Sequence, residues 1–348
     1  MRDVQNAPAA LTPELDRSAI MRRCADAFRI RPWIYWTDMV GSAAVGWTLF
    51  YLSTLAPLGS VAHVVMTLGA ILGLLRAALF IHELAHVKRT QLPGFDVVWN
   101  AIVGVPLIVP GIMYSGSHMD HHRRNGFGTM EDPEYAPIAT WSRPRIALFV
   151  LTVAFAPIAL AFRWAVLGPL SWICPPLRVL VVERLSTLGI NVHYRRAMPE
   201  GRKKVRWFRE EAACALFVWG VAVSAALGWI PLIAVVQWLI VGAGVLVVNQ
   251  LRTLAAHGYE NKGHPVDSEG QLLDSINLTG WPVLTALVAP VGLRYHALHH
   301  FLPNLPYHSL GMVHRRLLSE LPDDSPYRST SRNSFLEPVQ KLWNQAPA

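Results

Sequence analysis

Runs of about 20 apolar residues constrain the fold of this 348-residue chain more than any other feature. Hydrophobic residues make up 52% of the sequence and charged residues only 16%, an apolar excess over an ordinary soluble domain. A helix of about 20 apolar residues matches the hydrocarbon thickness of a bilayer. Four such stretches are clear, at 36–56, 61–81, 211–227 and 230–251. The sequence therefore predicts an all-α integral membrane protein with four main transmembrane helices.

Two further apolar stretches are short or interrupted. The stretch 99–114 contains Pro106 and Pro110, so we expect it to be re-entrant or to lie on the membrane surface. The stretch 146–182 is broken by Arg163 and several prolines, and it is expected to form either a pair of interfacial helices or a further hairpin. Either form keeps the number of crossings even.

Basic residues beside these stretches indicate the cytoplasmic side. Lys88 and Arg89 follow the second stretch, and seven Arg and Lys residues lie within 195–209. Because positive residues concentrate in cytoplasmic loops, we expect both segments and both termini in the cytoplasm. The first thirty residues show no pattern of a cleaved signal peptide. The expected parts are a cytoplasmic arm at 1–35, a membrane domain at 36–330 that ends in a helical cytoplasmic cap, and a tail at 331–348.

The charge distribution and the cysteine spacing argue against a nucleic-acid-binding protein and against a fold held by zinc or disulfides. The formal net charge is +8, and the basic residues cluster near the apolar stretches. This distribution favours a membrane protein with a basic cytoplasmic face and no nucleic-acid partner. Cys24, Cys174 and Cys214 have no spacing typical of a zinc site or a disulfide framework.

Histidines occur in three short boxes. Box one is His82 and His86, box two is His118, His121 and His122, and box three is His296, His299 and His300. Spacings of three and four residues place side chains on one face of a helix. Neutral imidazole is the commonest metal ligand, and eight of the 14 histidines suit two metal ions better than one. The alternative, helical histidines without a metal, explains this spacing poorly. The expected topology places all three boxes on the cytoplasmic face.

Two competing interpretations of the boxes stay open. His82-Glu83-x-x-His86 alone is also typical of zinc metalloproteases, including intramembrane proteases. Such a protease needs only one further ligand, so boxes two and three would be unexplained. A non-enzymatic metal transporter predicts ligands at mid-membrane depth, whereas these boxes begin at the ends of apolar stretches.

The three boxes and their flanks resemble the membrane fatty acid desaturase family. The flanks are Gly126-Phe-Gly-Thr-Met-Glu-Asp-Pro-Glu-Tyr135 after box two and Phe301-Leu-Pro-Asn-Leu-Pro-Tyr-His308 after box three. The resemblance covers about 36–318 and implies a non-haem di-iron centre that uses O2 and two electrons per turnover. It also implies a ninth ligand between the last span and box three, for which His257 is our prediction and His264 the alternative. Some relatives have an asparagine four residues before that histidine; this chain has Thr253.

Other polar residues near the boxes are predicted to play supporting parts. Glu83, Asp120 and Asp132 are the acids expected to contact metal-binding histidines. Glu131 and Glu134 either contact metal-binding histidines in the same way or belong only to a loop. We interpret His193 as a surface residue and His308 and His314 as structural.

The resemblance implies a lipid oxidase with iron as its metal. The predicted function is a fatty acyl desaturase acting on a lipid, with hydroxylation or oxidative decarboxylation to a terminal alkene as alternatives within the same family. The sequence shows no electron-carrying motif of its own, so electrons are expected from an external ferredoxin or cytochrome with its reductase.

Overall fold

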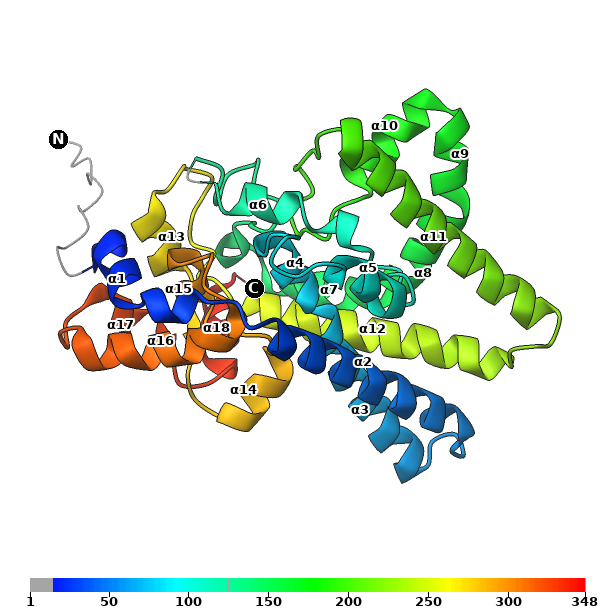
Figure 1. Cartoon of the computed structure of the whole chain (residues 1–348), viewed down its shortest axis with the longest axis horizontal. Coiled ribbons are helices and arrows are strands. Elements are labelled where there is room, and N and C mark those ends of the chain that lie inside the picture. Colours follow the sequence, from blue (N-terminus) through cyan, green and yellow to red (C-terminus); the bar gives the residue numbers. More distant parts are fainter. Residues whose placement is uncertain (1–14, 124, 348) are drawn as a thin grey trace.

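The computed structural model describes residues 15–123 and 125–347 (Figure 1). Among these residues the only strands are β1 (Asn277–Leu278) and β2 (Ser331–Arg332), which pair in parallel. Nearly all other regular structure is helical, which confirms the predicted all-α class. The helices before box two are α1 (Arg17–Arg23), the 3₁₀ helix η2 (Ala25–Phe28), α2 (Pro32–Leu55), α3 (Val61–Ala78), α4 (Phe80–His86), α5 (Phe95–Trp99), the π-helix η3 (Asn100–Gly104) and the 3₁₀ helix η4 (Gly111–Met113).

Helices α2 and α3 form a hairpin that leads into box one. Ser60 caps α3 by accepting a hydrogen bond from the backbone N–H of His63. Gly46 and Gly73 face each other, and a Cβ on Gly73 would lie 2.9 Å from the Cα of Gly46. Small residues at such a crossing let two apolar helices approach closely. Because α4 continues the direction of α3 after a short break, box one lies at the end of this hairpin (Figure 1).

Within the described part of the chain, three helical segments are long and apolar enough to cross a membrane: Val61–His86, Arg143–Ile173 and Leu232–Leu254. The first and last contain two of the four predicted spans. The predicted spans at 36–56 and 211–227 lie within helices α2 and α11 (Gly201–Ala226), which are less apolar and fall outside this set. The count of four spans, like the cytoplasmic orientation, stays a prediction, and reporter fusions after Lys88 and Arg206 would test it.

The interrupted stretch 146–182 forms a single bent helical segment followed by a reversal. Its parts are α7 (Arg143–Thr152), η6 (Val153–Phe155), α8 (Ala156–Phe162), the π-helix η7 (Arg163–Leu167) and α9 (Gly168–Ile173), and α10 (Pro175–Arg184) then turns back. The predicted alternatives were a pair of interfacial helices or a hairpin. The 31-residue segment is long enough to span, and only a small share of it is buried against the rest of the protein.

The stretch 99–114 forms no long helix. Its apolar helical part, Phe95–Gly104, has too few residues to cross, because a helix of about ten residues is only about 15 Å long. The Trp99 indole N–H donates to the carbonyl of Ala77, which holds this segment against α3. The chain therefore reaches box two, on helix α6 (Ser117–His121), through the 3₁₀ helix η4.

The C-terminal region forms a helical cap around box three. After α12 (Leu232–Leu254), single antiparallel bridges pair His257 with Ser275 and Asn277 with Tyr295. These bridges bring the segment after α12 beside box three. The cap helices are α13 (Ser268–Asp274), α14 (Pro282–Val288), α15 (His296–Phe301), α16 (Tyr307–Glu320), α17 (Pro326–Ser329) and α18 (Leu336–Gln345), and a short 3₁₀ helix, η5 (Ile138–Thr140), lies between α6 and α7.

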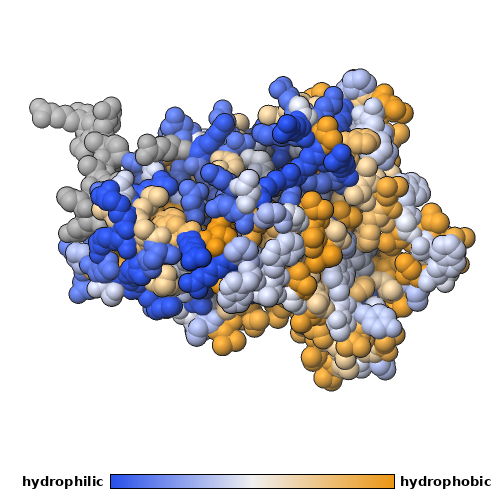
Figure 2. All heavy atoms as spheres, in the orientation of Figure 1, coloured by the Kyte–Doolittle hydropathy of each residue, from blue (hydrophilic) through white to orange (hydrophobic). Residues whose placement is uncertain are grey.

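The predicted C-terminal tail is part of this cap. Leu342 of α18 is 3% exposed and belongs to the same apolar cluster as Phe127 and Leu254. Figure 2 shows hydrophilic residues over the cap and hydrophobic residues over the α2–α3 hairpin and the far ends of α11 and α12. The cap and the apolar helices therefore meet where the three boxes lie.

Candidate metal centre

The three boxes lie on three short helices that meet between the apolar helices and the cap. Box one is on α4, box two on α6, and box three on α15. The helical spacing within each box turns its histidines toward the same region. His257 joins them from the segment after α12, whose bridge to Ser275 fixes its position. All nine predicted ligands are therefore brought together.

The nine histidines separate into two groups whose nitrogen atoms converge. Within each group, one ring nitrogen per residue lies within 4.8 Å of the others. Each group draws on more than one box, so neither exists without the tertiary fold. The first group is His82, His86, His118, His122 and His299, and the second group is His121, His257, His296 and His300.

Distances within the first group fit ligands around a common cation. The Nε2 atom of His118 lies 2.9 Å from that of His86 and 3.1 Å from that of His122, and His122 lies 3.1 Å from His299. Two ligands at right angles, each about 2.1 Å from an ion, are about 3 Å apart. Hydrogen bonds alone cannot account for the three contacts, since each Nε2 offers either one proton or one lone pair and four such atoms form at most two N–H···N bonds.

The second group has the same geometry. The Nε2 atoms of His296 and His257 are 3.0 Å apart, and those of His300 and His296 are 3.2 Å apart. Within the described structure, the Nε2 of His121 is buried and has no hydrogen-bond partner. Buried polar atoms of this kind are normally satisfied, so an unpartnered nitrogen aimed at other imidazoles fits a metal ligand.

Burial keeps most of these rings in the form that binds metal. Desolvation lowers the pKa of His118, His296 and His300 well below the usual value of histidine. The rings are therefore neutral near pH 7, and neutral imidazole is the ligand form. His299 follows the same pattern, with burial as the main cause of its lowered pKa.

Carboxylates hold the second ring nitrogen of three histidines. Asp132 lies 2.8 Å from Nδ1 of His121, and Glu134 lies 2.7 Å from Nδ1 of His118. Asp274 lies 3.2 Å from Nδ1 of His257. At His121 and His118 the carboxylate oxygen accepts the Nδ1 proton and leaves the Nε2 lone pair directed at the metal position. At His257 the Ser275 Oγ also lies 3.2 Å from Nδ1, beside the carboxylate of Asp274. These contacts are typical of the surroundings of metal-binding histidines.

The predicted acidic partners differ in their positions. Asp132 contacts His121 as expected. Glu83 is buried, and it accepts a hydrogen bond from the Tyr35 hydroxyl at 2.6 Å, while its other oxygen lies 3.6 Å from His82 Nδ1. Asp120 instead accepts a hydrogen bond from the Tyr194 hydroxyl at 2.7 Å and forms an ion pair with Arg123 at 3.3 Å, and neither partner belongs to a histidine group.

The remaining histidines lie outside both groups. His193 and His264 are exposed, so the alternative ninth ligand is not brought to the cluster. His314 bonds to the Tyr327 hydroxyl, and His308 accepts a hydrogen bond from the backbone N–H of Arg31. These positions agree with the surface and structural interpretations.

Sequence reasoning gave Glu134 no definite contact and did not single out Asp274. Glu134 follows Asp132 by two residues in the loop after box two, and this spacing was its only signal. Burial raises the pKa of the Glu134 carboxyl to about 7, while a hydrogen bond from the Tyr114 hydroxyl acts against that rise. Asp274 is brought to His257 only by the backbone bridge after α12, which no local pattern indicates.

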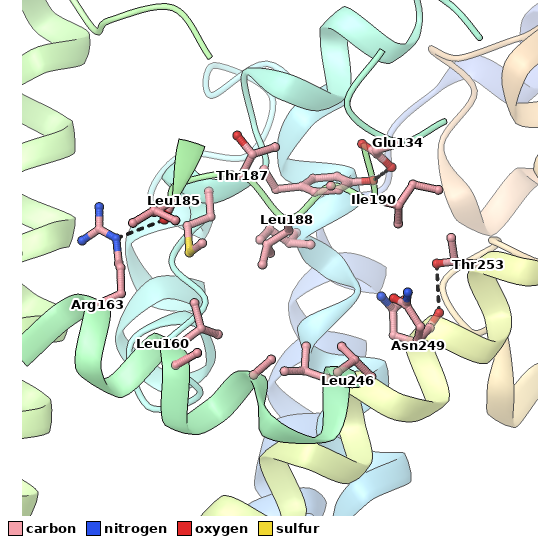
Figure 3. A pocket seen from close by; sticks show the side chains of 18 of the residues that line it. Glu134, Leu160, Arg163, Leu185, Thr187, Leu188, Ile190, Leu246, Asn249 and Thr253 are labelled. Carbon is pink, nitrogen blue, oxygen red and sulfur yellow. Dashed lines mark hydrogen bonds between the residues drawn. The ribbon is translucent and has the colours of Figure 1, made fainter. Parts of the chain in front are cut away.

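A largely apolar cavity of about 500 Å³ adjoins the first group (Figure 3). At one end its wall includes Glu134 and Tyr114, whose ring stacks on His118 with centroids 4.7 Å apart. Leu160, Leu188 and Leu246 line its middle (Figure 3). This size lies within the range of ligand pockets. An apolar ligand in the cavity would be separated from the first group by a single layer of side chains.

Comparison with known proteins decides the family. The pattern described as fatty acid desaturase matches residues 59–331. This chain belongs to the fatty acid desaturase family. A ceramide hydroxylase of Caulobacter vibrioides (strain NA1000 / CB15N) is 40% identical over 316 residues, which cover 90% of this chain and 88% of the relative. The predicted family is thereby confirmed, and with it a membrane-associated oxidoreductase of lipid metabolism with histidine groups that could bind metal.

The comparison with this relative favours a different one of the predicted activities. Desaturation was the main expectation and hydroxylation the alternative, and the name of the relative favours the alternative. The protease and transporter interpretations explain neither the family match nor the two groups of histidines.

Proposed function

We propose that this protein is an O2-dependent di-iron hydroxylase of a ceramide-like lipid. The observation that carries the proposal is the cavity of about 500 Å³ beside two converging histidine groups, in a chain 40% identical to a ceramide hydroxylase. The nine histidines are the proposed iron ligands, five for one ion and four for the other. Asp132, Glu134 and Asp274 orient three of them.

The reaction has a simple balance. A C–H bond breaks and a C–O bond forms, so that R–H, O2, two electrons and two protons give R–OH and water. The iron pair, when bound, supplies the activation of O2 that no side chain can provide. The chain contributes an apolar cavity that excludes water and fixed imidazoles whose orientation is set by carboxylates. The two electrons come from an external ferredoxin or cytochrome.

A second hollow supports a lipid with two chains. It has a volume of about 520 Å³ and shares Ile190 with the first cavity. Leu148 and Phe149 line it together with the exposed cations Arg145 and Lys262. Two neighbouring hollows on either side of one residue suit the two chains of a ceramide better than the single chain of a fatty acid.

Product analysis tests this proposal. Purified protein with two iron ions would be given ceramide, isotopically labelled O2, and a ferredoxin with its reductase. We expect a product that gains one labelled oxygen atom, and we expect His300→Ala to form none. A product that loses two hydrogens would restore the desaturase function, and a shortened terminal alkene would indicate decarboxylation.

A further inference from the structure

Two arginines line the cavity, and they differ in how their charge is balanced. Arg163 is paired with the buried carboxylate of Glu211 at 2.7 Å, and it also donates to the Ser186 hydroxyl and to the Leu185 carbonyl (Figure 3). Arg163 therefore has a carboxylate partner within the protein, which it shares with Arg178, 2.6 Å from the other Glu211 oxygen. The second arginine, Arg252, lies in the last turn of α12.

Arg252 has only neutral hydrogen-bond partners. Its Nε donates to Asn249 Oδ1 at 3.0 Å, and Nη2 reaches Thr253 Oγ1 at 3.4 Å. Across residues 15–123 and 125–347, no carboxylate forms an ion pair with it; Glu134 acts on it only over a longer distance. Guanidinium carries five N–H donors, and a charge removed from water without a partner is strongly unfavourable. A ligand that offers acceptor oxygens would satisfy it.

The position of Arg252 places this unsatisfied cation at the histidine end of the cavity. It is within electrostatic reach of His82 in the first group and of His296 in the second. Asn249, Thr253 and Glu134 line the same side of the cavity, which Figure 3 shows opposite Arg163. Arg252, which has no carboxylate partner among the described residues, therefore lies on the side of the cavity that carries Glu134, the partner of His118.

The rest of the cavity wall is mainly aliphatic. Val153, Ala156, Ala159 and Leu160 come from the bent helical segment Arg143–Ile173, and Leu246 comes from α12. A lipid oxidised in mid-chain needs its polar head several carbons away from the metals. This cavity offers the opposite arrangement, with its free cation beside the metals and its apolar wall beyond them.

We propose that Arg252 binds the amide carbonyl oxygen of the substrate, so that the oxidised carbon lies within a few bonds of the polar head. This inference rests on the proposed hydroxylation of a ceramide-like lipid and specifies its regiochemistry. Asn249 and Thr253 hold the guanidinium from one side, which leaves its other N–H groups for the ligand. The site of hydroxylation is then counted from the head and does not change with the length of the acyl chain.

Arg252→Met, Arg252→Lys and the control Arg315→Met test the inference, because Arg315 is exposed on α16. Each protein is assayed with ceramide and with an analogue in which an alkene replaces the amide, so that the acceptor oxygen is lost without adding a charge. For wild type, losing the carbonyl should lower kcat/KM about 10- to 100-fold, as expected for a hydrogen bond to a charged group. Arg252→Met should show a similar loss with ceramide and little further loss with the analogue, and Arg252→Lys should recover part of it.

Two further readouts separate binding from a structural effect. Iron content and thermal unfolding temperature should stay close to wild type in all three variants. Metal-free Arg252→Met should bind a fluorescent short-chain ceramide about tenfold or more weakly than metal-free wild type. The role of Arg252 would be overturned if Arg252→Met lowered kcat/KM by the same factor for ceramide and for the analogue. Unchanged ceramide binding by metal-free Arg252→Met would overturn it as well.

The position of the product hydroxyl completes the test. Mass-spectrometric fragmentation of products from ceramides of several chain lengths should place the hydroxyl at one constant position near the amide. A hydroxyl in mid-chain or near the methyl end would reject the inference and leave the hydroxylase function intact. If wild type hydroxylates no ceramide, the proposed function fails, and the inference fails with it.

Discussion

The two histidine groups differ in what surrounds them, although their ring geometry is similar. The first group has five histidines and contacts the cavity through Tyr114 and Glu134. The second has four histidines, all buried, two of which are oriented by Asp132 and Asp274. Rings of Phe127, Tyr135 and Tyr259 pack on this second group. In the proposed function, the second group would therefore hold its ion firmly and the first would face the substrate.

Removing one histidine of the second group should have the largest effect on iron content and turnover. This change tests whether the second group binds an ion of its own. We expect His257→Ala to lower the iron content from about two ions per chain to about one, and to reduce turnover at least about 100-fold, since even loss of an outer partner costs 10- to 100-fold. His193→Ala is the matched control, because His193 is exposed and outside both groups. Metal analysis and turnover of the purified variants check this prediction. Full activity of His257→Ala would reject His257 as the ninth ligand.

Removing single carboxylates should give a smaller effect that differs between the groups. Asp132→Asn and Asp274→Asn should each weaken binding of one iron ion about 10- to 100-fold, because the imidazole loses the acceptor that orients it. Glu134→Gln should weaken the other ion by a similar factor. Release of iron to a chelator, followed in two kinetic phases, would measure both ions in one experiment. The distinction between the groups would be lost if all three variants changed the same phase.

The candidate site could be predicted from the sequence more completely than the fold around it. Box spacing and the position of His257 predicted all nine converging histidines, because helical periodicity and proximity to the last span are local properties. The contact of Asp274 was not predicted. It depends on how the segment after α12 folds back on the cap, and a single sequence records no such long-range pairing.

The two predicted spans that fall outside the most apolar set, in α2 and α11, differ from the other two in composition. Helix α2 contains Trp, Tyr, Thr and Gly residues among its apolar ones, and α11 begins with a basic turn, so both are less apolar than α3 or α12. The prolines in 146–182 favoured an interruption. Instead, Pro157 and Pro169 lie in the first turns of helical parts α8 and α9, where a missing N–H is tolerated, and the helix continues.

Charge changes at the basic start of α11 should have the smallest effect on turnover. They test whether an electron carrier docks closer to the first histidine group than to the second. Arg202, Lys203 and Lys204 are exposed, and Arg206 of the same helix lines a small hollow with Glu83 beside box one. An acidic carrier docked here would approach the first group more closely than the second. Charge pairing mainly speeds encounter and weakens with salt, over a Debye length of about 10 Å at about 0.1 M.

Reversing these three charges to Glu should slow carrier-driven turnover roughly tenfold at low salt. The difference from wild type should shrink as the salt concentration rises, and iron content should not change. Reversal of Arg22, Arg29 and Arg315, three exposed residues outside α11, is the control for net charge and should have little effect. Stopped-flow reduction at several salt concentrations makes the comparison. If the three reversals leave the rate unchanged at every salt concentration, the basic run only marks the cytoplasmic side, because positive residues in loops set topology without any partner. Electrons would then have to enter through another face, and the proposed approach to the first group would lose its support.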